Sequence, residues 1–186
     1  MRKDVEEALK KFQVKTFGNK KNIERAESEL KDDEKVLFVI PTNATITTVN
    51  IRKKESLPGV FILTDKRFLF LFKVLLSHNI ETGTLDAINS INCSGNGLTA
   101  GHVQIHTITK SYDIIVPYKK KIIEMIHDTF LSAKETYDNN LRAKASSSSG
   151  DTDIVAQIEK LSELRDKNIL SEKEFETKKA ELLSRL

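Results

Sequence analysis

Residues 151–186 constrain the fold most, because they carry two apolar patterns of helical period separated by a helix-start signal. Large apolar side chains recur there at the spacing of one helix face: Ile154, Ile158, Leu161 and Leu164, then Phe175, Leu182, Leu183 and Leu186. Between the two sets, Ser171 and Glu174 have the spacing of a capping box, in which each side chain bonds to the other residue's backbone N–H. The segment therefore predicts a hairpin of two helices whose second helix begins at Ser171.

Three other features agree with this hairpin. Leu170 and Phe175 occupy the two positions of a hydrophobic staple across the start of the second helix. Asn168 suits the left-handed residue that ends the first helix. Four serines and a glycine at 146–150 form a polar hinge before the hairpin, and this composition is typical of flexible linkers. We therefore expect a linker over residues 144–152 and an independent hairpin over residues 153–186.

Short pieces of sequence within the hairpin match a known module. They are Leu-x-x-Leu-Arg-Asp-Lys at 161–167, Ile-Leu-Ser at 169–171 and Glu-Phe-x-x-Lys-Lys-x-x-Leu-Leu at 174–183. In this order they resemble the SHOCT domain, a short C-terminal module of bacterial and phage proteins. The sequence departs from the family at Asn168, where the family usually has glycine, and asparagine is the next most tolerant residue at positive φ.

Helices of roughly 12–15 residues are marginally stable alone in water, so the apolar face of the hairpin needs a second surface. We expect that face to consist of Leu161, Leu164, Phe175 and Leu182. Three surfaces could meet it: the rest of its own chain, a second copy or a partner protein. The polar hinge argues against packing onto its own domain, and the helix-packing spacing of the leucines favours a homo-oligomer.

Length and composition exclude several classes of protein. The 186 residues have room for one ordinary domain and a small appendage. A net charge of +3 and an aromatic content of 6% are too low for a nucleic-acid-binding protein. The single cysteine, Cys93, excludes an internal disulfide and fits a reducing compartment. The charged N-terminus is no signal peptide, and no apolar run approaches the ~20 residues of a membrane span, so we expect a soluble, cytoplasmic protein.

The rest of the chain divides into two regions by its pattern of apolar and turn-forming residues. Residues 1–32 carry narrow apolar stripes of helical period and predict a helical segment. Residues 33–143 carry short β-rich runs separated by turn signals, followed by a helix over about 119–143. The expected strands are 36–40, 59–63, 67–73, 88–93, 102–109 and 112–116. Antiparallel strands followed by one amphipathic helix predict an α+β fold, in which a partly open antiparallel β-barrel is capped by a C-terminal helix.

A second resemblance covers residues from about 33 to 135. Leu-Thr-Asp-Lys-Arg at 63–67 is similar to the turn between the second and third strands of bacterial pleckstrin-homology (PH-like) domains of the YokE type. Glu-Lys-Val-Leu at 34–37 resembles their opening strand, and Leu-Asp-Ala-Ile at 85–88 resembles a later segment. The resemblance implies a seven-stranded, partly open barrel, and its pairing with SHOCT implies a bacterial or phage protein. Within the turn, Asp65 is expected to accept hydrogen bonds from turn N–H groups.

The sequence carries no pattern of a catalytic or metal site. His102 and His106 share one face of a strand but lie roughly 13 Å apart at ~3.3 Å per residue, too far to bind one metal ion. We expect Cys93 to be a small buried residue. The glycine-rich residues 94–101 lack the Lys-Ser/Thr ending of a phosphate-binding loop and predict a hairpin loop. We therefore predict that the protein is no enzyme and uses no cofactor and no metal.

A triplet of basic residues is the remaining candidate for a binding site in the sequence. Arg52, Lys53 and Lys54 fall between the first two strands, in the loop that binds phosphoinositide headgroups in eukaryotic PH domains. Each such cation contributes about 1 kcal/mol near an anionic membrane, but Glu55 follows the triplet and a solvated loop explains the same residues. The sequence therefore favours a non-enzymatic interaction or scaffold module, with the barrel as a binding surface and the tail for self-association or partner docking. The alternative is a peripheral protein that binds anionic lipid.

Overall fold

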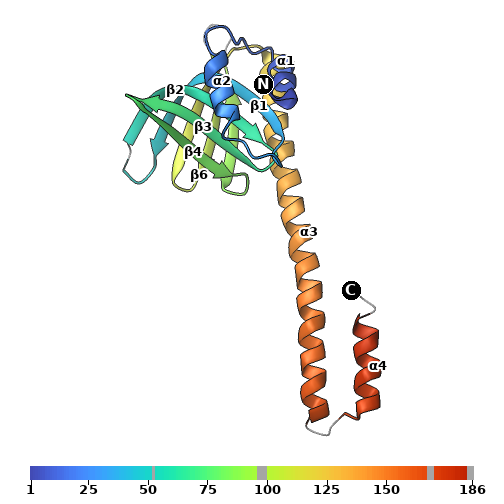
Figure 1. Cartoon of the computed structure of the whole chain (residues 1–186). Helices are drawn as coiled ribbons and strands as arrows, with labels where there is room; N and C mark the ends of the chain where they lie inside the picture. The colour runs from blue at the N-terminus through green and yellow to red at the C-terminus, as the bar shows by residue number, and fades with distance from the viewer. Residues whose placement is uncertain (52, 96–99, 167–169, 184–186) are drawn as a thin grey trace. The chain divides into compact units, whose positions relative to one another are not determined.

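The computed structural model describes residues 1–51, 53–95, 100–166 and 170–183, with side chains except over 145–156. Within these ranges the chain forms four helices and seven strands (Figure 1). In chain order they are α1 (Lys3–Lys11), α2 (Lys20–Glu27), β1 (Val36–Thr48), β2 (Lys53–Thr64), β3 (Arg67–Val74), β4 (Ser77–Thr84), β5 (Ile88–Ser94), β6 (Gly101–Thr107), β7 (Lys110–Val116), α3 (Lys120–Asp166) and α4 (Glu172–Leu183). The chain divides into two compact units, Met1–Asp138 and Asn139–Leu186.

The strands form one antiparallel sheet in the order β4-β3-β2-β1-β7-β6-β5. Strand β1 holds this sheet together, because it pairs with β2 along most of its length and with β7 from Ala44 to Thr48. Strands β4 and β5 stand at opposite ends of the order, so the described sheet curls without closing completely (Figure 1). This is the α+β, PH-like, partly open barrel that the sequence predicts.

Aromatic side chains fill the barrel. Phe38, Phe61, Phe68 and Phe70 are fully buried, and Phe130 of α3 joins the same cluster. The ring centroid of Phe130 lies 6.0 Å from that of Phe61 and 6.2 Å from that of Phe38. Such aromatic pairs contribute about 0.5–1.5 kcal/mol beyond the burial of their area. The part of α3 up to residue 138 therefore caps the barrel, as the sequence predicts.

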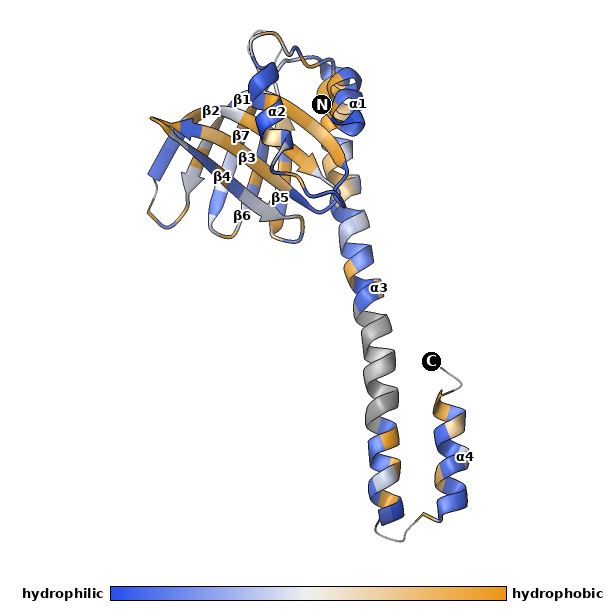
Figure 2. Cartoon of the chain, in the orientation of Figure 1, coloured by the Kyte–Doolittle hydropathy of each residue, from blue (hydrophilic) through white to orange (hydrophobic). Residues whose placement is uncertain are grey.

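The outer face of β1, β2 and β3 carries a second apolar cluster, which the N-terminal helices cover. The hydropathy colouring of Figure 2 shows this apolar surface of the sheet beside α1 and α2. Strand β3 serves both clusters, because Phe68 and Phe70 face the barrel interior whereas Leu69 and Leu71 face the helices. The helices contribute Val5, Ala8, Leu9, Ile23 and Ala26. Both apolar faces of β3 are thus covered, in keeping with its almost wholly apolar sequence.

The turn between β2 and β3 is closed by Thr64. The Thr64 Oγ1 atom accepts bonds from the N–H groups of Lys66 at 3.1 Å and Arg67 at 3.0 Å, and donates to the Arg67 carbonyl at 2.9 Å. Asp65 Oδ1 instead accepts a bond from the Lys35 N–H at 2.9 Å, just before β1. The expectation that Asp65 closes the turn is wrong, because the buried Thr64 hydroxyl already satisfies the turn N–H groups. Asp65 fixes the entry of the chain into β1.

The strands expected from the sequence omit β4, and two of them are shorter than the observed β1 and β2. No residue of β4 is buried, and its polar residues pair with β3 from Ser77 to Thr84. A strand at a sheet edge needs only one partner, so it can lack the apolar runs that reveal a central strand. The sequence does not indicate the full lengths of β1 and β2, because Pro41 and Pro58 have no N–H for the hydrogen bonds between strands. Both prolines nevertheless lie within the pairing of β1 with β2.

The C-terminal unit is the predicted two-helix hairpin. The Glu174 carboxylate accepts bonds from the Ser171 N–H at 3.0 Å and the Ser171 hydroxyl at 2.6 Å. The Glu174 N–H donates to Ser171 Oγ at 3.4 Å, which completes the predicted capping box. The Leu170 N–H bonds to the Leu164 carbonyl at 3.2 Å. Asn168 lies outside the described residues, so its left-handed conformation stays a prediction.

Helix α3 includes residues 144–152, where the serine-rich composition predicts a linker. The side chains of most of these residues lie outside the described set, so the division into 1–32, 33–143, 144–152 and 153–186 stays a prediction. Among the described residues, no helix combines the length and the apolar composition needed to cross a membrane.

Candidate binding surfaces

The hairpin has an apolar groove between α3 and α4. Three leucines and three charged side chains are among the residues that line this groove of about 380 Å³: Leu161, Leu164, Leu182, Lys160, Lys178 and Glu181. Each leucine is partly exposed, although each faces the groove. Three of the four residues predicted for the interaction face therefore lie together.

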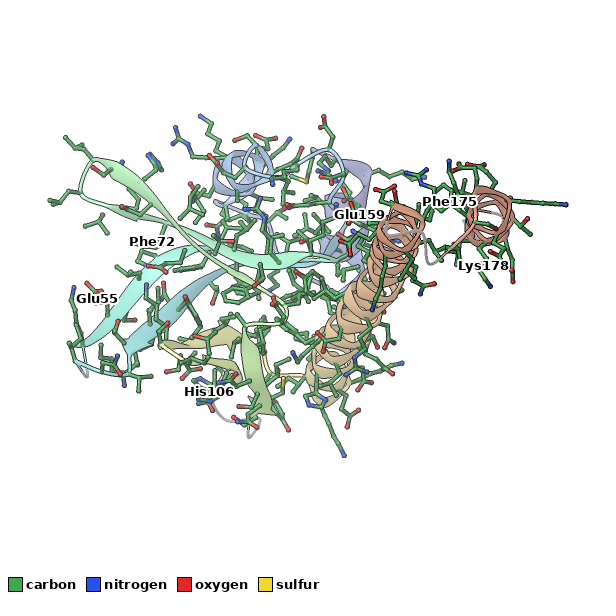
Figure 3. The ribbon with its side chains drawn as sticks, turned by 90° about the horizontal axis from the view of Figure 1, so that it is seen from below. Glu55, Phe72, His106, Glu159, Phe175 and Lys178 are labelled. Atoms are coloured by element: carbon green, nitrogen blue, oxygen red, sulfur yellow. The ribbon has the colours of Figure 1, made fainter. Side chains whose placement is uncertain are left out.

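Phe175, the fourth residue of that predicted face, is buried inside the hairpin. Its exposed fraction is 4%. The Arg165 guanidinium lies 4.7 Å from the centroid of its ring and the Lys179 ammonium lies 5.5 Å from it. Figure 3 labels Phe175 and Lys178 on α4. Cations over an aromatic face contribute about 0.5–1 kcal/mol at exposed sites, so Phe175 stabilises the hairpin from within.

A second surface lies at the end of the barrel that carries the β1–β2, β3–β4 and β6–β7 loops. The Val49 N–H bonds to the Thr109 carbonyl at 2.9 Å, which joins the first and third of these loops. Because β2 and β3 are antiparallel neighbours, the β3–β4 loop lies at the same end as the β1–β2 loop. The three loops expose large apolar side chains: Val49, Ile51, Val74, Leu75, Leu76 and Ile108.

The β3–β4 turn has unusual residues at its tip. Val74 pairs with Ser77, so Leu75 and Leu76 form a two-residue turn, in which glycine is favoured at a position of positive φ. Leu75 has a φ of 55°, and its side chain and that of Leu76 are 90% and 89% exposed. A left-handed conformation costs a non-glycine residue about 1–3 kcal/mol, and no burial offsets it here. Such an outlier suggests a functional reason for the leucines.

The predicted basic contact at Arg52, Lys53 and Lys54 is only partly described. Arg52 lies outside the described residues. Lys53 Nζ forms an ion pair with Glu55 Oε1 at 3.0 Å, and Lys54 lines a small cavity with His106. The cationic character of this loop is therefore reduced by its own carboxylate.

Glu81 ties the open side of the barrel together. Its two carboxylate oxygens accept bonds from the Lys110 ammonium at 2.7 Å each, and one also accepts from the Tyr112 hydroxyl at 3.4 Å. Burial, followed by the Glu81 charge, raises the pKa of Tyr112 well above its usual range. Strands β4 and β7 are not neighbours in the sheet, so this cluster connects an edge strand to a strand four places away in the order. The sequence carries no signal for it, because the partners are far apart in the chain.

Cys93 and the histidines are the side chains to consider for chemistry or metal binding. Burial raises the pKa of the Cys93 thiol to about 11, so this thiol is protonated at neutral pH and is a weak nucleophile. His102 Nδ1 lies 2.9 Å from Asp113 Oδ1 across two strands. Among the described residues, no group of three or more His, Cys, Asp or Glu side chains could hold a metal ion.

The family model of SHOCT, the short C-terminal domain, matches residues 156–183. This match confirms the resemblance to SHOCT over these residues, and the strand order with its capping helix gives the body its PH-like fold. Comparison of the sequence with curated proteins finds no match.

Solved structures similar to this chain include several PH domains. The Vps36 N-terminal PH domain shares 15% identity over 61% of this chain and 86% of its own, with a TM-score of 0.38. The N-terminal PH domain of human ARAP2 shares 13% identity over 53% of this chain and 80% of its own, with a TM-score of 0.32. A structure of Vav1 with an allosteric inhibitor shares 12% identity over 61% of this chain but only 33% of that chain, with a TM-score of 0.41. We assign the fold from the strand order and the capping helix, because similarities this low do not establish a fold by themselves.

Proposed function

We propose that this protein is a non-enzymatic interaction module that forms homo-oligomers through the groove of its C-terminal hairpin. The main support is the placement of Leu161, Leu164 and Leu182, which line one groove while each stays partly exposed. The PH-like body supplies a second binding surface in this proposal. A bacterial or phage origin and a cytoplasmic location, which the sequence implies, belong to the same proposal.

Burial of apolar surface favours association of the hairpin. Complete burial of a leucine side chain contributes about 1.5–3 kcal/mol, so a half-exposed leucine gains about 1 kcal/mol when a partner covers it. Helix α4 has 12 residues, a length at which an isolated helix is marginal in water. Of the described side chains in this unit, Phe175 alone is buried, so the hairpin's own core is small. A second surface over the groove would supply the apolar contacts that the small core of the hairpin lacks.

The charges at the groove favour a second copy as that surface. Lys160, Lys178 and Glu181 all line the groove, so it carries both signs of charge. In a two-fold interface the same patch meets itself, and the lysines of one copy can face the glutamate of the other. A groove with charges of a single sign would repel its own copy. Light scattering on the full chain and on a chain ending at Ala145 tests this proposal: an oligomer and a monomer are expected.

The exposed β3–β4 turn favours a second candidate function, contact with an anionic membrane. Leu75 and Leu76 are almost fully exposed, and Val49 and Ile51 of the β1–β2 loop are also exposed at the same end of the barrel. Apolar side chains at a loop tip can enter the headgroup region, and lysines at the same end of the barrel, such as Lys53, add attraction to anionic lipid. Flotation with vesicles that contain or lack anionic lipid tests this function separately from self-association.

A further inference from the structure

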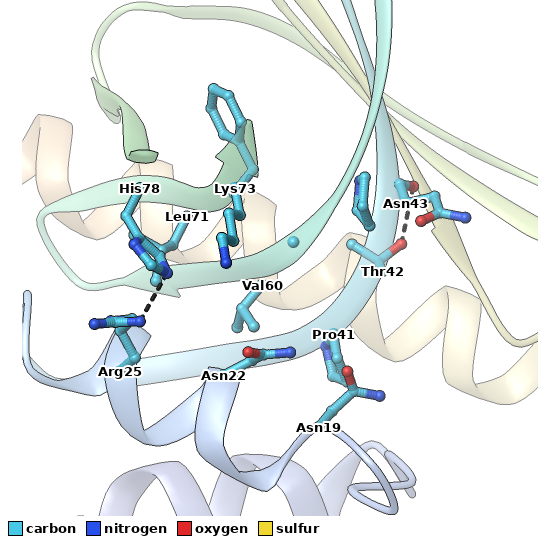
Figure 4. Close-up of a pocket in the computed structure, with 13 residues that line it drawn as sticks. Asn19, Asn22, Arg25, Pro41, Thr42, Asn43, Val60, Leu71, Lys73 and His78 are labelled. Carbon is cyan, nitrogen blue, oxygen red and sulfur yellow. Dashed lines mark hydrogen bonds between the residues drawn. The ribbon is translucent and has the colours of Figure 1, made fainter. Parts of the chain in front are cut away.

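A cavity of about 420 Å³ lies on the outer face of the sheet, between α2 and strands β1–β4 (Figure 4). It shares no residue with the hairpin groove or with the 49–54 loop. Its floor includes the short side chains of Pro41 and Val60, which leave space that a larger residue would fill. This volume lies within the usual range of about 300–1,000 Å³ for small-molecule sites.

Helix α2 presents a polar stripe to this cavity. Asn19, Asn22 and Arg25 follow one another at intervals of three residues, so they lie along one side of the helix (Figure 4). The neighbouring stripe, Ile23 and Ala26, is buried on the sheet and fixes the orientation of the helix. The amide and guanidinium groups are therefore held over the sheet by apolar packing beside them.

Side chains from two further elements complete the wall. Lys73 of β3 and His78 of β4 are opposite each other in the strand register, and both line the cavity. Arg25 Nη1 lies 2.7 Å from His78 Nε2 (Figure 4). A guanidinium can only donate, so His78 Nε2 accepts this bond and the imidazole is neutral. Burial, then the charges of Arg25 and Lys73, lower the pKa of His78.

The positive charge at this cavity has no carboxylate to balance it. None of the described lining residues is acidic. Within the part of the chain that the structure describes, neither Arg25 nor Lys73 forms an ion pair. Many other exposed lysines do have a carboxylate partner, such as Lys20 with Glu24 and Lys66 with Asp33. The cavity thus combines two unneutralised cations with several amide donors.

We propose that this cavity binds a phosphate group, carried by a small soluble molecule or by a lipid headgroup. A phosphate monoester carries about −1.5 to −2 charges at neutral pH, which matches the two cations. The arginine fork suits two of its oxygens, and the amide groups of Asn19 and Asn22 can donate to the others. The remaining volume admits a small organic group next to the phosphate. This site is independent of the oligomerisation proposed above.

The pKa of His78 provides a direct readout on the full chain. A bound dianion beside the imidazole favours its charged form, so inorganic phosphate should raise the pKa of His78, by about one unit. The measurement follows the imidazole carbon resonances across a pH titration by NMR. His102, His106 and His127 lie outside the cavity and act as internal controls. An unchanged His78, or an equal shift of all four histidines, would overturn the proposal.

Two substitutions assign the binding to these side chains. Arg25→Gln and Lys73→Gln should each weaken phosphate binding about tenfold, the loss of roughly one charge-assisted contact. Lys21→Gln is the matched control, because Lys21 is an exposed residue of the same helix that does not line the cavity. Circular dichroism verifies that each variant is folded. Equal affinity in all three variants would contradict the assignment.

Two further probes separate the sources of the phosphate. Glycerol phosphate should compete with inorganic phosphate at His78 if the natural ligand is soluble. Vesicles of phosphatidylcholine containing a phosphoinositide should bind the chain, and lose binding in Arg25→Gln, if the ligand is a lipid headgroup. Binding of neither probe would overturn the proposal.

Discussion

Arg67 Nε donates to Glu34 Oε1 at 2.9 Å, and the Glu34 side chain is only 2% exposed. The two residues are 33 positions apart, so this ion pair ties the β2–β3 turn to the segment that precedes β1. Arg67 also donates to the Glu29 carbonyl at 2.9 Å. The Thr-Asp-Lys-Arg turn thus anchors the connection between α2 and the sheet, which gives a structural reason for its arginine.

Loss of Arg67 should therefore cost much stability. Arg67→Met leaves the Glu34 carboxylate buried without its cation, a change that typically costs about 3–5 kcal/mol. Urea unfolding measures the loss. The control is Lys66→Met, because its ion pair with Asp33 is largely exposed and such pairs contribute about 0–1 kcal/mol. Equal losses in the two variants would show that the buried pair does not stabilise the fold.

Thr64→Val should destabilise the same turn more than Asp65→Ala does. The substitution keeps the shape of the fully buried Thr64 but removes the oxygen that accepts from two N–H groups. Unsatisfied buried groups cost about 1–3 kcal/mol, whereas loss of the Asp65 bond to the exposed Lys35 N–H should cost about 0.5–2 kcal/mol. Urea unfolding of both variants gives the order. The reverse order would show that Asp65, and not Thr64, closes the turn.

Asp4 should make stability depend on acid pH. It accepts bonds from the Val36 N–H at 2.8 Å and from the Arg2 guanidinium at 3.0 and 3.1 Å. Burial acts to raise its pKa, but these bonds outweigh burial and hold the pKa below the ordinary 3.8. A folded pKa below the unfolded one means that the stabilisation is complete above the unfolded pKa and is lost as the pH falls through the folded pKa.

The Asp4→Asn variant tests this dependence. Its Tm should be lower than that of the natural chain at neutral pH, and the difference should shrink as the pH falls below 3.8. Thermal unfolding across the acid range measures both. Asp86→Asn, at an exposed position, should change neither value. A constant Tm difference at all pH values would exclude a contribution from the ionised Asp4 carboxylate.

Replacement of the β3–β4 tip should separate stability from membrane contact. Leu75→Gly with Leu76→Asn places glycine at the left-handed position and a polar residue beside it, so stability should rise by about 1 kcal/mol as the strain is relieved. If the tip enters membranes, flotation with anionic vesicles should weaken at the same time. Leu131→Asn is the control, since Leu131 is an exposed leucine of α3 outside the loops. Undiminished flotation would exclude the tip as the contact.

Local signals let the sequence predict the hairpin and most of the sheet. The Ser171 capping box depends on residues three positions apart, and β3 shows its two buried faces in its composition. Strand β4 gives no such signal, because an edge strand can be polar. The tie of Glu81 to Lys110 and the meeting of Arg25 with His78 depend on distant segments, so spacing in one sequence cannot reveal them.

The leucines of the hairpin groove could be predicted for the same reason. Helical spacing places Leu161, Leu164 and Leu182 on one face, and these leucines line the groove. Spacing alone does not tell which apolar residue fills the interior, and Phe175 does so here. The choice depends on how the two helices meet, which a single-helix pattern does not contain.

Sedimentation equilibrium of the full chain tests the central claim of self-association most directly. The chain mass is 21.1 kDa, and the natural protein should sediment with at least twice this mass at micromolar concentrations. Leu182→Asp places a charge in the groove and should reduce the mass to that of a monomer. The neighbouring Leu183→Asp is the matched control, because Leu183 is exposed and does not line the groove.

Circular dichroism must show the same helix and strand content in all three proteins, so that loss of association is not loss of folding. An oligomer in the natural chain and in Leu183→Asp, with a monomer in Leu182→Asp, is the expected result. A monomeric natural chain, or an oligomer that persists in Leu182→Asp, would contradict self-association through the groove.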